Sequence, residues 1–291
     1  MTVTIIGLGL IGGSLALDMR RLGLANHILG VDANDIHANR ALELGLVDEI
    51  TDIETGVERA ELIAVAISVD ATVRILPFIM DMTENQIVFD VGSTKKPVID
   101  VLKGHKKRMN FVAAHPMAGT EYSGPEAALE RLFENKALII CNREDSSSRA
   151  LDVVESVFEA LGMNILSMDS AEHDMHAAYV SHISHISSFA LALTVLHKEK
   201  DEKSIFNLAS GGFESTVRLA KSSPDMWSPI FLQNKRNILE VLDTYINFLY
   251  DFKLAIFNND AERLHYLMRK GNSIKEVLGK QEKREPELVQ Q

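Results

Sequence analysis

The sequence predicts an α/β amino-terminal domain, a doubly wound parallel sheet with helices on both faces, followed by an all-α carboxy-terminal domain. Up to about residue 168, short β-branched runs alternate with helical stretches, which is typical of such a sheet. From residue 169 onward the strand signals stop, and apolar residues recur every three or four positions in long stretches. We therefore expect two domains, spanning residues 1–168 and 169–291.

The first domain is expected to alternate strands with helices. The strands are expected at residues 3–6, 27–31, 62–67, 86–90, 110–114, 137–141 and 164–167. The helices between them are expected at residues 11–22, 36–44, 71–80, 96–103 and 148–161. Helical connections between strands favour parallel pairing, because parallel strands need a crossover. The second domain is expected to hold helices at residues 171–197, 224–256 and 260–278.

The composition indicates a globular protein with a sizeable core, since 46% of its residues are hydrophobic. The net charge of −11 argues against binding to nucleic acid, which demands a basic surface. Apolar runs such as 62–69 and 189–196 are shorter than the ~20 residues of a membrane span, so no membrane partner is expected. The single cysteine, Cys141, and the lack of a basic leader favour a cytoplasmic location.

A glycine motif lies directly between the first strand and the first helix and reads Gly7-Leu8-Gly9-Leu10-Ile11-Gly12. In a dinucleotide-binding unit, the first glycine permits the tight turn, the second lets the backbone approach a pyrophosphate, and the third allows close helix packing. The amino terminus of the helix offers N–H groups to the anion. A glycine-rich turn without a ligand would look the same in isolation, but the position between strand and helix favours a Rossmann-type cofactor site.

The second strand ends at Asp32, about 25 residues after Gly7, where a carboxylate can accept a hydrogen bond from the ribose 2′-hydroxyl. Its charge repels a 2′-phosphate, and the residues that follow, 33–35, include no arginine to hold one. We therefore expect NAD rather than NADP. The alternative role for Asp32, a helix cap, is filled more naturally by Asn34 or Asp35.

A nicotinamide oxidises an alcohol only if a base accepts the hydroxyl proton. His115 is the candidate, because the strand at 110–114 brings it to the edge where doubly wound folds bind ligands. Another strand ends shortly before Ser93, whose hydroxyl could bond either His115 or the substrate. Taken singly, His115 could be a turn histidine fixed by Pro116, and Ser93 could cap the helix that follows.

Further motifs follow in order: Asp90-Val-Gly-Ser-Thr-Lys95, His115-Pro-Met-Ala-Gly-Thr-Glu121, Val180-Ser-His-Ile-Ser-His185, and Gly211-Gly-Phe213 through Arg218-Leu-Ala-Lys221 to Met226-Trp227. With the glycine loop, they make the chain resemble the prephenate and arogenate dehydrogenases of tyrosine biosynthesis over nearly its whole length. The resemblance implies NAD-dependent oxidative decarboxylation of prephenate to 4-hydroxyphenylpyruvate. Arogenate dehydrogenase and dual-specificity cyclohexadienyl dehydrogenase are the alternatives within the family. Aromatisation drives the loss of carbon dioxide, so no metal is expected.

The resemblance also implies a substrate site. Arg218 matches the carboxylate-binding arginine, whose planar fork suits that task, and His185 is placed near the substrate side chain. Glu121 belongs to an entrance gate with Arg218, and Trp227 matches an aromatic position near the pocket. From spacing alone, Arg218 could equally pair with Glu214, and Trp227 could be a packing anchor.

Four histidines fall within the expected helix at 171–197. On an ideal helix with about 100° per residue, His173 and His176 lie at roughly 0° and 300°, whereas His182 and His185 lie at roughly 180° and 120°. One continuous helix therefore cannot gather all four around a metal ion. We expect His173 and His176 in an exposed first turn.

Specificity and assembly are less constrained by the sequence. Ser215 stands where many relatives carry aspartate, which weakens the gate and leaves the choice between prephenate and arogenate open. The extensive apolar helix faces predict a homodimer through the second domain, as the family resemblance also implies. Because the helical region fills the chain to its end, we expect no added regulatory domain. Two rival functions remain, a β-hydroxyacid dehydrogenase and a non-catalytic NAD-binding regulator. The simultaneous presence of Ser93, His115, His185 and Arg218 argues against the regulator.

Overall fold

The computed structural model describes residues 1–202 and 204–278, which form two compact units. The first unit spans residues 1–238, and the second begins at Leu239. The last strand ends at Met168, whereas the first unit continues through several helices to Ile238. The domain limits 1–168 and 169–291 remain a prediction, and the part of the second range beyond Leu278 lies outside the described residues.

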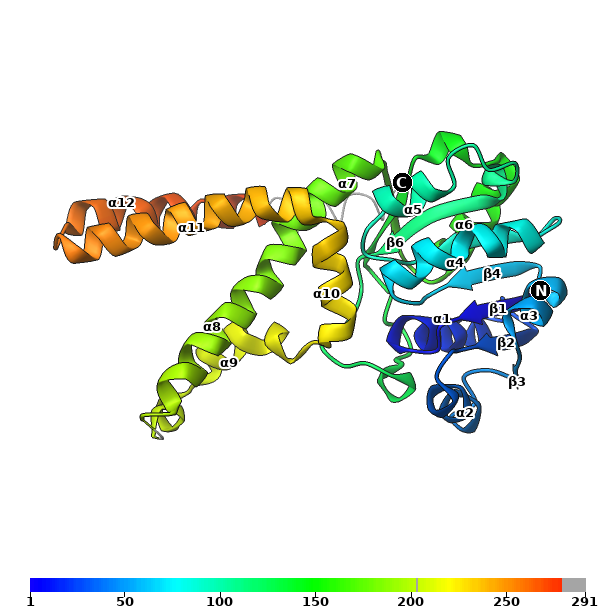
Figure 1. Cartoon of the computed structure of the whole chain (residues 1–291), viewed down its shortest axis with the longest axis horizontal. Helices are drawn as coiled ribbons and strands as arrows, with labels where there is room; N and C mark the ends of the chain where they lie inside the picture. The colour runs from blue at the N-terminus through cyan, green and yellow to red at the C-terminus, as the bar shows by residue number, and fades with distance from the viewer. Residues whose placement is uncertain (203, 279–291) are drawn as a thin grey trace. The chain divides into compact units, whose positions relative to one another are not determined.

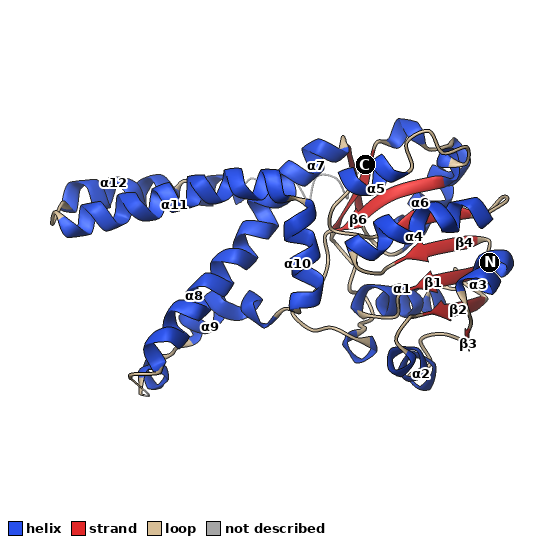
Figure 2. Ribbon diagram, in the orientation of Figure 1, coloured by secondary structure: helices blue, strands red, loops and turns tan. Residues whose placement is uncertain are grey.

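The first unit is built on one eight-stranded sheet with the order β3-β2-β1-β4-β5-β6-β7-β8 (Figures 1 and 2). Its strands are β1 (Thr2–Ile6), β2 (His27–Val31), β3 (Glu49–Ile50), β4 (Leu62–Val65), β5 (Ile87–Asp90), β6 (Phe111–Pro116), β7 (Ala137–Cys141) and β8 (Asn164–Met168). The order reverses between β1 and β4, so β1 and β4 flank the switch point where such folds bind ligands.

The direction of the strands departs from the prediction at one edge of the sheet. The first six strands pair in parallel, as their crossover connections predict. However, β7 runs antiparallel to β6, and β8 is parallel to β7. The chain between β6 and β7, residues 117–136, forms only the short 3-10 turn Pro125–Ala127 rather than a crossover α-helix, so β7 returns in the opposite direction.

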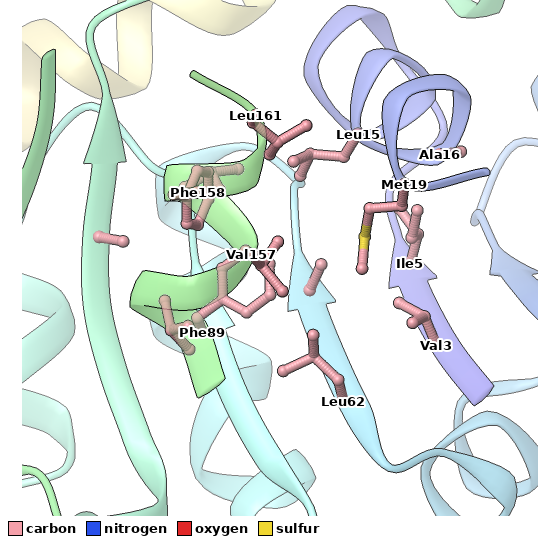
Figure 3. Packing of buried hydrophobic residues seen from close by; sticks show 14 of the residues in the cluster. Val3, Ile5, Leu15, Ala16, Met19, Leu62, Phe89, Val157, Phe158 and Leu161 are labelled. Atoms are coloured by element: carbon pink, nitrogen blue, oxygen red, sulfur yellow. The ribbon is translucent and has the colours of Figure 1, made fainter. Parts of the chain in front are cut away.

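Helices cover both faces of the sheet, which confirms the doubly wound architecture. They are α1 (Leu10–Arg21), α2 (Asp35–Glu43), α3 (Ile53–Arg59), α4 (Val69–Met82), α5 (Lys96–Val101) and α6 (Ser148–Ala160). On one face, Leu15 of α1 and Phe158 of α6 pack against strand residues that include Phe89 (Figure 3). The Phe89 and Phe158 rings meet edge to face at 5.4 Å. On the other face, Leu76 of α4 and Val98 of α5 belong to a second buried cluster.

Burial on both faces explains why most of the strands are readable from the sequence. All four residues of β4 are buried, and strands buried on both sides appear as continuous apolar runs. The prediction did not include β3 or α3. The two residues of β3 and the seven of α3 are too short to show a period.

The helices after β8 still belong to the first unit. They are α7 (Ser170–Ala177), a π-helical turn (Ala178–His182), α8 (Ile183–Glu199), α9 (Gly211–Val217) and α10 (Pro224–Gln233), with 3-10 turns at Ile205–Leu208 and Arg218–Lys221. The carboxylate of Asp169 accepts the N–H groups of Ala171 and Glu172 and thereby begins α7. Pro224 occupies the first turn of α10, where its missing N–H costs nothing.

The continuous helical segment Ser170–Glu199 has 30 residues and an 18-residue window of mean hydropathy 1.3, of which 17% is buried. By length and composition alone, it is long and apolar enough to cross a membrane. We expected no such segment, because uninterrupted apolar runs such as 189–196 are short. The helix exceeds those runs because polar residues such as Ser184 and His185 do not interrupt it.

The second unit holds most of α11 (Lys235–Phe257) together with α12 (Ala261–Asn272). Within it, Arg263 of α12 donates to the carboxylate of Asp251 at 2.8 Å, and the ammonium of Lys270 lies 5.9 Å from the centre of the Phe248 ring. Many apolar side chains of these helices are exposed, and that of Phe257 is 81% exposed.

Candidate active site

The glycine loop after β1 has the geometry that a bound dinucleotide requires. Gly7 has φ +99°, and a Cβ there would lie 2.5 Å from the carbonyl oxygen of Ala66. A Cβ at Gly12 would lie 1.9 Å from the carbonyl oxygen of Gly7, so α1 packs directly on the turn. Around Gly9, by contrast, no described atom outside its chain neighbours lies within 4 Å of a Cβ position. The open side of the loop is therefore at the glycine where a pyrophosphate would approach.

The carboxylate of Asp32 is held against this loop. It accepts the N–H of Leu8 at 2.8 Å and the N–H of Asn34 at 2.9 Å. The cap of α2 is Asn34, whose side chain accepts the N–H groups of Ile36 and His37. The capping alternative for Asp32 is thus wrong, and its carboxylate stands at the end of β2 where a ribose hydroxyl would bond it.

A cavity of about 260 Å³ lies beside the start of α1 and brings most of the predicted site residues together. It is lined by Leu10, Ile11, Val91, Ser93, His115, Pro116, Met117, Ala118, Gly119, Thr120, Ser181, His185, Arg218, Leu219, Met226 and Trp227. The lining comes from the ends of β5 and β6, the cofactor loop, and the helices after β8. The cavity therefore adjoins the glycine loop at Leu10 and Ile11.

His115 lies within β6, near its carboxyl end, rather than in the loop that follows, and only 8% of its surface is exposed. Its Nδ1 is 2.8 Å from Nε2 of His173, and the two rings meet at 70°. Burial lowers the pKa of His115 well below 6.5, and the nearby His173, Lys95 and His182 lower it further. The ring is therefore neutral at neutral pH, as a proton acceptor must be.

Ser93 lines the same cavity, half-buried, at the turn after β5. Its hydroxyl makes no hydrogen bond with the residues that the structure describes. The capping alternative for Ser93 is wrong, because the N–H groups of Lys95 and Lys96 donate to the carboxylate of Asp174 at 2.8 and 3.0 Å. A carboxylate from α7 thus begins α5, which leaves the serine hydroxyl available to the cavity.

Arg218 pairs with Glu121, as the family resemblance implies. The guanidinium donates to Oε2 of Glu121 at 2.7 Å, and Glu214 lies instead 3.8 Å from Lys221. The arginine side chain is 49% exposed, so this ion pair stands at the mouth of the cavity. The backbone N–H of Glu121 and the Arg218 guanidinium hold the pKa of the Glu121 carboxyl below its usual range. Ser215 is exposed, and its hydroxyl donates to the carbonyl of Gly212 at 3.0 Å.

Trp227 and His185 form a stacked pair in the wall of the cavity. Their ring centres are 3.5 Å apart at an angle of 27°. Trp227 is 6% exposed and also packs with Val69 and Ile230, so the predicted packing role and the predicted pocket role coexist. Burial, His182 and Arg218 lower the pKa of His185 to about 4, so this ring is also neutral at neutral pH.

The prediction that His173 lies in an exposed first turn is wrong. Its surface is 2% exposed, and its Nδ1 lies 2.8 Å from Oδ1 of Asp174. Of the two histidines expected in that turn, only His176 is exposed. Because the π-helical turn comes after His173, it does not account for that burial, but it does turn the later histidines, since one additional residue in a turn sets the following residues back by about 100°. His185 thereby moves from roughly 120° to roughly 20° from His173.

Several buried polar residues next to the site were not singled out from the sequence. The ammonium of Lys95 is fully buried, pairs with Asp90 and bonds the carbonyl oxygen of Ala114. The signal that could have indicated this pair is a lysine five residues after a strand-ending aspartate. Asn234 donates to the carbonyl of Asp174 at 2.6 Å and has no readable signal, since its partner is 60 residues away. Among residues 1–202 and 204–278, no group of three or more metal-ligating side chains occurs.

Family models match the chain in two parts. The model described as prephenate dehydrogenase, nucleotide-binding domain, matches residues 15–167. The model described as prephenate dehydrogenase, dimerization domain, matches residues 169–270. Together the two matches span β2 to β8, the cavity lining from Val91 onward and most of the following helices.

Individual relatives agree with these matches. A curated prephenate dehydrogenase from Bacillus subtilis is 32% identical over 267 residues, which is 90% of this chain and 72% of the relative. The crystal structure of prephenate dehydrogenase from A. aeolicus, in complex with hydroxyphenyl propionate and NAD+, is 32% identical with a TM-score of 0.82 and covers 95% of this chain and 98% of its own. Synechocystis arogenate dehydrogenase is 30% identical with a TM-score of 0.73, over 96% and 100% of the two chains. The resemblance found in the sequence is confirmed, and the chain belongs to the prephenate dehydrogenase family.

Proposed function

We propose that the chain catalyses the NAD-dependent oxidative decarboxylation of prephenate to 4-hydroxyphenylpyruvate, a step of tyrosine synthesis. The observation that carries this proposal is the cavity that joins the glycine loop, the neutral His115 and the guanidinium of Arg218. The loop that would hold a hydride acceptor, a proton acceptor and a carboxylate-binding cation thus adjoin one space. The curated and solved relatives named prephenate dehydrogenase support the same reaction.

The chemistry needs a base at the substrate hydroxyl. When NAD is bound, it accepts the hydride from the ring carbon that bears the hydroxyl. His115 takes the hydroxyl proton as that carbon becomes a carbonyl, and Ser93 is placed to orient the hydroxyl from the same cavity. Carbon dioxide then leaves the opposite ring carbon, and its bonding electrons complete the aromatic ring. Aromatisation supplies the driving force, so the side chains only position the substrate and move one proton.

Binding requires local positive charge, because prephenate carries two carboxylates and the chain has a net charge of −11. Arg218 at the mouth of the cavity offers a planar pair of donors, which suits a carboxylate. His185 lines the same cavity and would present a neutral ring, stacked on Trp227, to the substrate side chain. Glu121 holds Arg218 until a substrate carboxylate takes its place.

Arogenate is the second candidate substrate, and the similarity to Synechocystis arogenate dehydrogenase favours keeping it. Arogenate bears an ammonium where prephenate has a keto group, so it would gain from a carboxylate beside its side chain. Ser215 stands where the family often has aspartate, and its hydroxyl is engaged with Gly212. Ser215 is exposed and does not line the cavity, so it favours neither substrate, and the preference for prephenate rests on the relatives named prephenate dehydrogenase.

The test offers prephenate and arogenate separately to the purified chain, each with NAD or NADP, and follows the absorbance of the reduced nicotinamide. We expect turnover with prephenate and NAD, and weak turnover with NADP, because the carboxylate of Asp32 repels a 2′-phosphate. Turnover with arogenate alone would change the substrate and keep the mechanism. Cofactor binding without turnover of either compound would contradict the dehydrogenase and favour an NAD-binding regulator.

We also propose that the chain is a cytoplasmic homodimer, assembled through its helical part. The exposed apolar side chains support this assembly: Leu193 on α8 is 65% exposed, and Phe257 on α11 is 81% exposed. The family model for residues 169–270 is that of a dimerization domain. Sedimentation equilibrium should give about twice the chain mass of 32.3 kDa. A monomer, or a chain that fractionates with membranes, would contradict this proposal and leave the apolar helix faces to another partner.

A further inference from the structure

Three side chains in a row lead from the cavity into the interior. Nδ1 of His115 lies 2.8 Å from Nε2 of His173, and Nδ1 of His173 lies 2.8 Å from Oδ1 of Asp174. All three residues are buried, with exposures of 8%, 2% and 4%. One nitrogen of His115 is thereby occupied, and only Nε2 is left for a ligand in the cavity.

The hydrogen bonds of Asp174, the last residue of this row, determine which ring nitrogens of the two histidines carry hydrogen. The carboxylate of Asp174 already accepts the N–H groups of Lys95 and Lys96, so toward His173 it is an acceptor. Nδ1 of His173 must then carry the hydrogen. In a neutral ring the other nitrogen is an acceptor, so Nε2 of His173 receives the Nδ1–H of His115. The same rule leaves Nε2 of His115 without a hydrogen, which is the form that accepts a proton.

Hydrogen bonds from neighbouring residues hold both ends of this row in place. Asp174 is fixed by the start of α5 through its carboxylate and by Asn234 through its carbonyl, to which the Asn234 amide donates at 2.6 Å. On the other side, Lys95 bonds the carbonyl oxygen of Ala114, the residue before His115. The base and its outer partner are thus tied to the same few residues after β5.

We infer that His173 and Asp174 are positioning residues that hold His115 in the tautomer with a free Nε2, aimed at the substrate hydroxyl. The inference rests on the proposed function, because it names what prepares the base of that reaction. When His115 accepts the hydroxyl proton at Nε2, the hydrogen on Nδ1 stays in its bond to His173. The positive charge on the ring is then stabilised by the Asp174 carboxylate through the His173 ring that lies between them.

The test compares His173→Leu, which removes the acceptor, with His173→Gln, whose amide oxygen can still accept from His115. In His173→Leu the Nδ1–H of His115 is buried without a partner, so the ring reverts to the other tautomer. We expect kcat to fall roughly 10- to 10²-fold, with the KM for prephenate and the affinity for NAD nearly unchanged. His173→Gln should recover most of the loss. His176→Leu, an exposed histidine on the same helix, is the matched control and should keep the kcat of the unmodified chain.

A second measurement reads the tautomer directly and needs neither substrate nor cofactor. In protein with isotope-labelled histidine nitrogens, nuclear magnetic resonance distinguishes Nδ1–H from Nε2–H, and the spectrum of His115→Asn assigns the His115 signals. We expect Nδ1–H in the unmodified chain and in His173→Gln, and Nε2–H in His173→Leu. An Nε2–H signal for His115 in the unmodified chain would overturn the inference, as would a kcat for folded His173→Leu within threefold of the unmodified chain. Absence of all turnover would instead contradict the proposed function, and the spectrum would still decide the tautomer.

Discussion

Replacement of His115 by asparagine is expected to lower kcat with prephenate by about 10³-fold, within the 10²- to 10⁴-fold range of a general base. Asparagine matches the position of Nδ1 and can keep the contact with His173, but it offers no basic nitrogen to the hydroxyl proton. The rate of reduced nicotinamide formation at saturating substrate measures the loss. The affinity for NAD should be unchanged, because His115 lies on β6 and the dinucleotide loop follows β1.

The control for this variant is His27→Asn, which changes a half-exposed histidine at the start of β2, away from the cavity. It should leave kcat unchanged.

The same base sets the pH profile of the unmodified chain. Because burial lowers the pKa of His115 well below 6.5, the ring stays neutral as the pH falls through 6.5. The acid limb of kcat/KM should therefore lie below pH 6.5. A limb at or above that value, or an active His115→Asn variant, would show that another group is the base.

Replacement of Arg218 by leucine is expected to lower kcat/KM for prephenate by about 10²-fold, mostly through a higher KM. The variant removes a charge-assisted pair of hydrogen bonds to a substrate carboxylate. It also releases Glu121, whose carboxylate then faces the substrate without a partner, since Arg218 donates to it at 2.7 Å. Steady-state kinetics at saturating NAD measure both parameters.

Two further variants make this result specific. Lys221→Leu removes another exposed cation from the same 3-10 turn, outside the cavity lining, and should leave KM unchanged. Glu121→Gln frees Arg218 and removes a negative charge from the cavity mouth, so KM should fall or stay constant rather than rise. If Arg218→Leu and Lys221→Leu raise KM equally, the effect is a general loss of positive charge, and Arg218 is not the carboxylate ligand.

Most of the sheet was predictable because its strands are buried on both faces and therefore appear as apolar runs between helices. Seven strands were placed to within about two residues, whereas β3, with two residues, shows no pattern. The reversal at β7 was not predicted. Strand direction depends on whether the connection carries a crossover helix, and residues 117–136 carry only a 3-10 turn.

The cavity wall was predictable where a residue follows a strand or belongs to a family motif, as with His115, Ser93 and Arg218. The buried residues that contact these wall residues from behind were not predictable. His173 and Asp174 sit in a polar first turn that resembles a solvated helix end, and their burial depends on α5 and Asn234. Contacts between residues 60 to 80 positions apart leave no local pattern in a sequence.

The π-helical turn Ala178–His182 accommodates one residue more than an ordinary α-helical turn. Deletion of one residue within it would return the turn to α-helical spacing and place His185 eleven positions after His173. At about 100° per residue, eleven positions lie at roughly 20°, which is the direction that the π-helical turn already gives His185. The face of α8 that lines the cavity would therefore keep its residues. When sequences of this family are compared, a one-residue gap between residues 178 and 182 thus keeps the pocket residues aligned, whereas an alignment without that gap pairs each of them with its neighbour.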